Sequence, residues 1–275
     1  MDEFRLGLIG ASIGRSQAPW LHKKAGQLCG LQIHYKLFDL NELSDKDLKT
    51  LLDRLIAQGF HGVNITHPVK EQVTRFVDIP DEAMRRIGAV NTLCFADRTA
   101  YNTDYSGFIK AFQKKFGTVT PGKVLMLGAG GVGKAIAFAL LHLDVNTELS
   151  IVDTNLQKSS HLANELKSAG LRANAYETNL IAELSKVDGL INCTPLGMYQ
   201  YPGCALPQHL FGGQSWAFDA VYTPLKTEFL QCAQKANLET LSGYELFFYQ
   251  GRDAFELFTG YQVDEAALRK ALSHL

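Results

Sequence analysis

A glycine-rich turn between an apolar run and an alanine-rich segment is the stretch best suited to binding a nucleotide. The run Val124–Leu127 is typical of a strand buried on both faces, and the motif Gly128-Ala-Gly130-Gly-Val-Gly133 follows it directly. Gly128 permits a tight turn, Gly130 lets a pyrophosphate approach the backbone, and Gly133 lets a helix pack closely on the strand. The first N–H groups of that helix favour a phosphate. The pattern predicts a dinucleotide site.

The glycine stretch has two other interpretations. Gly128 to Lys134 also fits the phosphate loop of nucleoside triphosphatases, but Ala135 stands where that loop needs Ser or Thr to hold magnesium. A glycine turn without any ligand is the other possibility. It is disfavoured because a second strand follows and ends at Asp153, where a carboxylate binds the ribose hydroxyls of NAD.

A second set of polar residues follows the strands expected in the N-terminal part, where open α/β sheets bind their ligands. The stretches are Asn64-Ile-Thr66-His-Pro-Val-Lys70, Asn91-Thr92 and Asn102-Thr-Asp104. A protonated lysine can donate a proton and a carboxylate can accept a hydrogen bond, so Lys70 and Asp104 are candidate acid–base groups. Taken alone, however, Lys70 is better explained as a solvated lysine, and Asp104 is better explained as a helix cap.

The elements expected before the glycine motif complete one α/β domain. A helix from about residue 44 would have Ser44 as its cap, and Pro68 would end the third strand. The expected strands are 5–9, 33–38, 62–66, 89–95 and 99–102, and the expected helices are 19–29, 44–56, 70–76 and 81–87.

The second half alternates strands and helices, as a doubly wound parallel sheet requires. Strands are expected near residues 124, 148, 172, 189 and 216, after a connecting helix over 105–116. The chain beyond Gly243 is expected to be helical and to return to the first domain. The expected division is therefore 1–104 completed by 243–275, and 105–242 as a Rossmann-like nucleotide-binding domain.

Composition narrows the class of protein. The chain has 275 residues, 46% of them hydrophobic, and a formal net charge of −1, so we expect no nucleic-acid or membrane partner. Its five cysteines form no CxxC pair and its eight histidines have no metal-ligand spacing. This favours a cytoplasmic protein without a metal site. We expect it to be a monomer or a homodimer.

Eight short motifs occur in order between about residues 6 and 260. They are Ser16-Gln-Ala-Pro19, Asn64-Ile-Thr-His-Pro-Val-Lys70, Gly88-Ala-Val-Asn-Thr92, Asn102-Thr-Asp104, Gly128-Ala-Gly-Gly131, Asn192-Cys-Thr-Pro195, Asp219-Ala-Val-Tyr222 and the helix of Gln250. Together they resemble the shikimate dehydrogenase family. The resemblance implies reversible hydride transfer between a ring alcohol of shikimate or quinate and its 3-dehydro ketone, in the shikimate pathway of aromatic amino acid biosynthesis.

The resemblance also implies a role for individual residues. Lys70 and Asp104 would be the catalytic pair. The substrate would lie against Ser16, Ala18, Thr66, Asn91, Tyr222 and Gln250. The cofactor would lie against Gly128, Ala129, Gly130, Gly131, Val132, Gly133, Asp153, Lys158, Thr194, Pro195, Val221 and Gly243.

The chain departs from the usual family pattern at two places. Ala18 replaces a second serine on the substrate carboxylate, and Asp153-Thr-Asn155 replaces the Asn-Arg-Thr of NADP-using members. A carboxylate at 153 would repel a 2′-phosphate, so NAD is the expected cofactor, while Lys158 leaves NADP possible. Two alternatives are a nucleotide-binding regulator that has lost turnover and a bifunctional folate-type dehydrogenase. The intact pair Lys70 and Asp104 disfavours the former, and Asn102-Thr-Asp104 with the Gln250 helix disfavours the latter.

Overall fold

The chain divides into two units, each with its own internal contacts. The computed structural model describes residues 2–41 and 47–273. One unit comprises Met1–Thr103 with Phe248–Leu275, and the other comprises Asp104–Phe247. The sequence placed these boundaries after 104 and 242. In the structure, the second boundary falls within helix α9 (Gly243–Thr259), whose first turn packs with the second unit.

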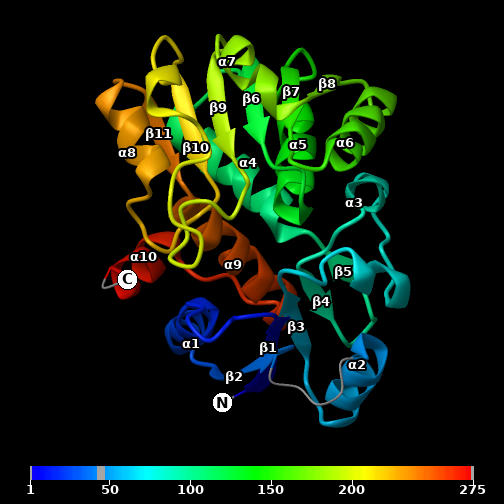
Figure 1. Cartoon of the computed structure of the whole chain (residues 1–275). Coiled ribbons are helices and arrows are strands. Elements are labelled where there is room, and N and C mark those ends of the chain that lie inside the picture. The colour runs from blue at the N-terminus through cyan, green and yellow to red at the C-terminus, as the bar shows by residue number, and fades with distance from the viewer. Residues whose placement is uncertain (1, 42–46, 274–275) are drawn as a thin grey trace. The chain divides into compact units, whose positions relative to one another are not determined.

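The first unit is built on a mixed five-stranded sheet. Its strands are β1 (Glu3–Gly10), β2 (Gln32–Asp39), β3 (Gly62–Ile65), β4 (Thr92–Cys94) and β5 (Ala100–Tyr101). Their order is β2-β1-β3-β4-β5, with β1 parallel to β2 and β3, and with β4 antiparallel to β3 and β5 (Figure 1). All four residues of β3 are buried, so both faces of this central strand are covered.

Helices cover both faces of this sheet. On one face, α2 packs its leucines, among them Leu51 and Leu55, into a cluster with Ile9 and Val63. On the other face, His22 of α1 contacts the ring of Phe258 in α9, which confirms that C-terminal helices return to the first unit. The helices of this unit are α1 (Ala18–Leu28), α2 (Leu48–Ala57), the 3₁₀ helix η1 (Gln72–Phe76), α3 (Glu82–Ile87), α10 (Glu265–Ala271) and the later part of α9.

Two helix starts differ from the sequence prediction. Asp47 caps α2 by accepting from the backbone N–H of Thr50, and the predicted cap Ser44 lies outside the described residues. The predicted helix over 70–76 is a short 3₁₀ helix, because a turn after Pro68 occupies its first residues.

The second unit is a six-stranded, fully parallel sheet. Its strands are β6 (Lys123–Leu127), β7 (Glu148–Val152), β8 (Arg172–Tyr176), β9 (Gly189–Asn192), β10 (Trp216–Asp219) and β11 (Glu239–Ser242). The order β11-β10-β9-β6-β7-β8 reverses direction at the pair β6 and β9, which is where such sheets bind nucleotides. The doubly wound prediction is confirmed, although the four-residue edge strand β11 was missed.

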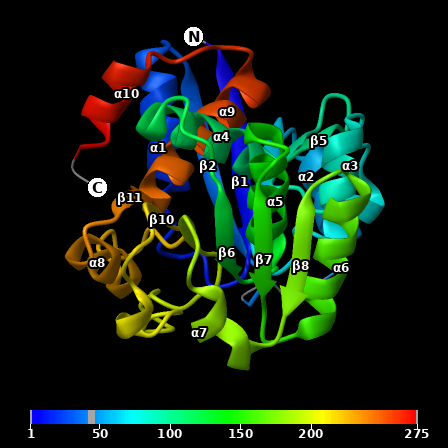
Figure 2. The ribbon, with the colours of Figure 1, turned by 90° about the horizontal axis from the view of Figure 1, so that it is seen from above.

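Helices lie on both faces of the parallel sheet. Phe108 and Phe112 of α4 contact Phe218 and Trp216 of β10, while Ala217 between them points to the cluster of α8. At the other edge of the sheet, α6 runs beside β8 (Figure 1 and Figure 2). The helices are α4 (Thr103–Phe116), α5 (Gly131–Leu143), α6 (Leu156–Ser168), α7 (Ile181–Leu184), α8 (Glu228–Lys235) and the 3₁₀ turns η2 (Thr178–Leu180) and η3 (Gln208–Leu210). No helix among the described residues is long and apolar enough to span a bilayer.

Candidate active site

The glycine turn between β6 and α5 has the geometry that a pyrophosphate needs. Gly128 has a φ of +97°, which a residue with a side chain rarely adopts. A Cβ on Gly133 would lie 2.4 Å from the carbonyl oxygen of Gly128, so helix and turn are in close contact there. A Cβ on Gly130 would meet no atom within 4 Å. The space beside Gly130 is therefore open, and Gly131 and Val132 begin the helix at its edge.

The carboxylate of Asp153 lies beside this turn. Asp153 directly follows β7, and its Oδ2 accepts a hydrogen bond of 2.8 Å from the backbone N–H of Ala129. Its Oδ1 accepts from the N–H of Asn155, which in turn caps α6. Each oxygen keeps a further lone pair for a ribose hydroxyl. Lys158 is exposed in the first turn of α6.

The segment after β9 packs directly on the glycine turn. A Cβ on Gly128 would lie 2.8 Å from the carbonyl carbon of Cys193. Oδ1 of Asn192 accepts from both the N–H and the hydroxyl of Thr194, at 3.0 and 2.7 Å. Thr194 is half-buried, and Pro195 beside it is exposed. Buried Asn192 therefore fixes the conformation of a loop at the switch point.

The segments after β10 and β11 also meet at this edge. Gly243 packs so closely that a Cβ would lie 2.5 Å from the carbonyl oxygen of Ala220. Val221 is buried, and its N–H donates to Oδ1 of Asp219 at 3.0 Å. The ring of Tyr222 stacks on Phe247 with centroids 4.8 Å apart. Thr194 thus lies against the glycine turn, while Val221 and Gly243 follow β10 and β11 at the same edge of the sheet.

In the first unit, the loop between β1 and α1 carries Ser16. Asp39 holds this loop, because its carboxylate accepts from the N–H groups of Ser12 and Ile13. Partial burial opposes ionisation of Asp39, but these N–H groups and that of Asn41 outweigh it and lower the pKa. Oγ of Ser16 accepts from the N–H of Ala18 at 3.3 Å, which leaves the hydroxyl of Ser16 to donate.

Backbone hydrogen bonds gather the residues that follow β3. The N–H of Thr66 donates to Ile9 of β1, and the carbonyl of Lys70 accepts from Val90 at 3.0 Å. The carbonyl of Asn91 accepts from Ile65 at 2.8 Å. Thr66 and Lys70 are both half-buried. Thr66, Lys70 and Asn91 therefore lie around one end of β3, although 25 positions separate the first from the last.

Asn91 and Gln250 meet through a threonine pair that the sequence analysis did not assign. Oδ1 of Asn91 accepts from the N–H of Thr103 at 2.7 Å, and Thr92 Oγ1 lies 3.3 Å from Thr103 Oγ1. Oε1 of Gln250 accepts from Asn91 Nδ2 at 3.5 Å. Because Oδ1 of Asn91 accepts from Thr103, the amide is held in one orientation, and Nδ2 has a second hydrogen that can reach a ligand. The resemblance named Asn91 and Gln250, but nothing in the sequence tied them to Thr103.

A buried polar chain lies beneath Asn91. The hydroxyl of Tyr35 donates to Oδ1 of Asn64 at 2.8 Å, and Asn64 Nδ2 donates to Thr92 Oγ1 at 3.2 Å. The ring of His22 stacks on Tyr35, with centroids 4.9 Å apart. Burial lowers the pKa of His22 to about 3, although a hydrogen bond with Asn64 acts in the opposite direction. His22 is therefore neutral at physiological pH.

The assigned residues divide between the two units. Ser16, Thr66, Lys70, Asn91 and Gln250 belong to the first unit. Asp104 is buried at 6% exposure in the first turn of α4 and belongs to the second unit. So do Tyr222 and the residues assigned to the cofactor.

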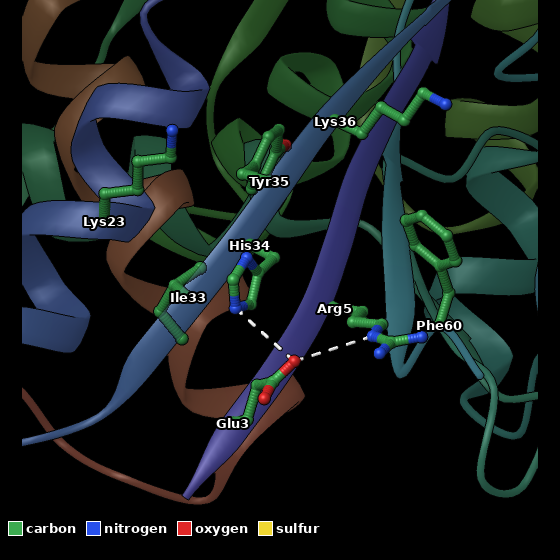
Figure 3. Close-up of a pocket in the computed structure, with 8 residues that line it drawn as sticks. All are labelled: Glu3, Arg5, Lys23, Ile33, His34, Tyr35, Lys36 and Phe60. Atoms are coloured by element: carbon green, nitrogen blue, oxygen red, sulfur yellow. Dashed lines mark ion pairs between the residues drawn. The ribbon is translucent and has the colours of Figure 1, made fainter. Parts of the chain in front are cut away.

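A surface hollow of about 400 Å³ lies along β1 and the edge strand β2 and contains none of the assigned residues (Figure 3). Glu3 forms ion pairs there with His34 at 3.4 Å and Arg5 at 3.6 Å. These side chains are about half exposed, so the hollow is an ordinary charged surface.

Comparison with known proteins agrees with this geometry. Residues 8–93 match the family described as the shikimate dehydrogenase substrate binding domain. A quinate/shikimate dehydrogenase (NAD(+)) of Corynebacterium glutamicum is 35% identical over 100% of this chain and 99% of its own length. The chain belongs to the shikimate dehydrogenase family. Another member of the shikimate dehydrogenase family, a shikimate dehydrogenase (NADP(+)) of Arthrobacter sp., is 37% identical over 98% of this chain and 94% of its own.

Solved structures of the shikimate dehydrogenase family share the whole fold. Quinate dehydrogenase from C. glutamicum in complex with NAD gives a TM-score of 0.92 at 35% identity and covers 100% of both chains. Shikimate 5-dehydrogenase from Thermus thermophilus in complex with NADP(H) and shikimate gives 0.85 at 32% identity, covering 98% of this chain and 99% of its own. The match is therefore not confined to the nucleotide-binding sheet.

Proposed function

We propose that this chain is a shikimate/quinate dehydrogenase that prefers NAD. The observation that carries the proposal is the convergence of Thr66, Lys70, Asn91 and Gln250 from three parts of the sequence in the first unit. The relatives that match over their full length are named for these acids, one as a quinate/shikimate dehydrogenase and the other as a shikimate dehydrogenase. The cofactor preference rests on Asp153, whose carboxylate lies beside the glycine turn.

The polar groups of the chain suit both the carboxylate and the ring hydroxyls of the substrate. Ser16 donates its hydroxyl to the ring carboxylate, and Asn91 and Gln250 present amide groups to ring hydroxyls. Oxidation of a ring alcohol removes a hydride from carbon and a proton from oxygen. When bound, the nicotinamide supplies the acceptor for the hydride.

Lys70 exchanges the proton with the ring hydroxyl. In the oxidising direction neutral Lys70 takes the proton, and in the reducing direction protonated Lys70 returns it to the ketone oxygen. Asp104 orients the ring by accepting a hydrogen bond from a neighbouring ring hydroxyl, because the hydroxyl that reacts has a single proton and gives it to Lys70. Asn91 assists because its Nδ2 donates to a neighbouring ring oxygen.

The open space at Gly130 and the first N–H groups of α5 are consistent with a pyrophosphate. Asp153 then accepts from the two ribose hydroxyls and repels the 2′-phosphate of NADP. We further propose a cytoplasmic enzyme, because free thiols such as the five cysteines are typical of a reducing compartment. We propose that it is a monomer or a homodimer.

The test is a set of initial rates for shikimate and quinate with NAD and with NADP. We expect turnover of at least one acid and a higher kcat/KM with NAD. A ring alcohol without the carboxylate is the control and should react poorly, since Ser16 has nothing to hold. A protein that binds NAD but turns over neither acid would support the regulator instead.

A further inference from the structure

Asp219 is a buried carboxylate that the proposed mechanism does not use. It ends β10, and its side chain has no exposed surface. A buried charge is retained only where several hydrogen bonds compensate for its lost hydration. Asp219 lies at the carboxyl edge of the parallel sheet, on the strand next to the switch point.

The two oxygens of Asp219 connect three separate segments. Oδ1 accepts from Nδ2 of Asn192 at 2.9 Å and from the N–H of Val221 at 3.0 Å. Oδ2 accepts from the hydroxyl of Thr227 at 2.5 Å. Thr227 also caps α8, because its Oγ1 accepts from the N–H of Leu230. One side chain thus ties together β9, the turn after β10 and the start of α8.

Asn192 extends these ties to the loop beside the glycine turn. Its Nδ2 donates both to Asp219 and to the carbonyl of Leu196, so its Oδ1 is left to accept from Thr194. Without Asp219, the amide of Asn192 loses the partner that sets its orientation. The positions of Thr194 and Val221 therefore both depend on the same carboxylate.

We propose that Asp219 is a positioning residue for the cofactor site. It acts through Asn192 on Thr194 and directly on the backbone of Val221, and it need not touch the cofactor. The proposal rests on the proposed function, because Thr194 and Val221 lie against a cofactor only if the chain binds one as the family resemblance implies. This role differs from a purely structural one, since replacing Asp219 should weaken the binding of the cofactor more than the binding of the ring acid.

The test measures binding of NAD and of shikimate separately by titration calorimetry, together with the melting temperature. Asp219→Ala should raise the Kd for NAD at least tenfold and change the Kd for shikimate less than twofold. Asp219→Asn keeps an oxygen for Asn192 and Val221, and it should restore NAD binding to within about threefold of wild type.

Thr227→Val is the matched control. It removes the Thr227 bond and the cap of α8 but leaves the ties to Asn192 and Val221. It should lower the melting temperature without changing the Kd for NAD. If Asp219→Ala does not fold, Asn192→Ala cuts the branch to Thr194 and should show the same selective loss.

Unchanged NAD affinity in Asp219→Ala, or in Asn192→Ala where that takes its place, would overturn the inference. So would a loss of NAD affinity in Thr227→Val equal to that in Asp219→Ala. Failure of the wild-type protein to bind NAD or NADP is a different result, because it contradicts the proposed function itself.

Discussion

The backbone N–H of Thr103 donates a 2.7 Å hydrogen bond to Oδ1 of Asn91, and Asp104 is the next residue along the chain. The bond fixes the orientation of the Asn91 amide and therefore the direction in which its Nδ2 can donate to a ligand. It also anchors the first residue of α4, from which Asp104 projects. One hydrogen bond thus helps to position both Asn91 and Asp104, two of the residues assigned to the ring alcohol.

Thr103→Val tests the side-chain part of this anchor. Valine keeps the backbone bond to Asn91 but loses the hydroxyl, which lies 3.1 Å from Asn91 Oδ1 and 3.4 Å from Gln250 Oε1. We expect kcat to fall about tenfold, since one hydrogen bond contributes up to about 1.5 kcal/mol and the orientation of Asn91 and Gln250 depends on it. Thr103→Ser retains the hydroxyl and should stay within about threefold of wild type in steady-state kinetics. Equal losses in both variants would refute the role of the hydroxyl.

Lys70→Ala should lower kcat by about two or more orders of magnitude, the usual range for an acid–base group. The KM for shikimate or quinate should change less, because other residues hold the ring. Steady-state rates are the measurement, and Lys49→Ala is the control, since Lys49 is an exposed lysine paired with Asp53. A Lys70→Ala variant that keeps most of its turnover would exclude Lys70 from proton transfer.

Gly130→Val should fold normally and lose the cofactor. A side chain at Gly130 meets no protein atom within 4 Å, and its φ of −77° suits any residue. It would instead fill the space expected for the pyrophosphate. Calorimetry should show at least a hundredfold weaker NAD binding at an unchanged melting temperature. Gly133→Val is the contrasting variant and should cost about 1–3 kcal/mol of stability, because its Cβ would clash with Gly128. Normal NAD binding by Gly130→Val would place the cofactor elsewhere.

Asp153→Asn should reduce the preference for NAD. Wild type should favour NAD by about tenfold or more in kcat/KM, roughly 1.4 kcal/mol. Asparagine keeps an oxygen for the N–H of Ala129 but removes the charge that repels a 2′-phosphate. Adding Thr154→Arg should shift the ratio further toward NADP, since arginine pairs with phosphate. Kinetics with each cofactor measure the ratio, and a wild type that prefers NADP would contradict this placement of Asp153.

His22 should make the first unit sensitive to acid. Its pKa is about 3 in the folded chain and about 6.5 when unfolded, so the unfolded state binds the extra proton between these values. The free energy of unfolding should therefore fall as the pH drops from about 6.5 toward 3, by about 5 kcal/mol in total. Urea unfolding at several pH values measures this. His22→Phe should flatten the profile, while His34→Gln on the exposed face of β2 should not. An unchanged slope in His22→Phe would mean that other groups cause the acid sensitivity.

Asp219 should change the free energy of unfolding with pH in the opposite direction to His22. Burial raises its pKa to about 6, against hydrogen bonds from Thr227, Val221 and Asn192, while its unfolded value is about 3.8. The folded state thus binds the proton more tightly, and stability from this group falls as pH rises from about 4 to 6. The neighbouring thiols Cys193 and Cys204 have pKa values that burial raises, so they stay neutral in this range.

Local sequence was sufficient for the elements whose signals are local. Each of these elements is indicated by residues that are close together in the sequence. They are the glycine turn after an apolar strand, the alternation of strands and helices, and the polar stretch Asn64 to Lys70. The doubly wound sheet and the family followed from them. The edge strand β11 was missed because three of its four residues are polar and give no clear alternation.

The tertiary structure decided how the polar groups are held. The amide of Asn91 is oriented by Thr103, 12 positions away, and Asp219 is tied to Asn192 across 27 positions. Neither pairing can be predicted from the sequence, because asparagine, threonine and aspartate are also common at turns and caps, where they have other partners. A hydrogen bond depends on distance and angle after the strands have aligned in register. Sequence therefore identified the residues able to do the chemistry, and packing determined which of their atoms are free to do it.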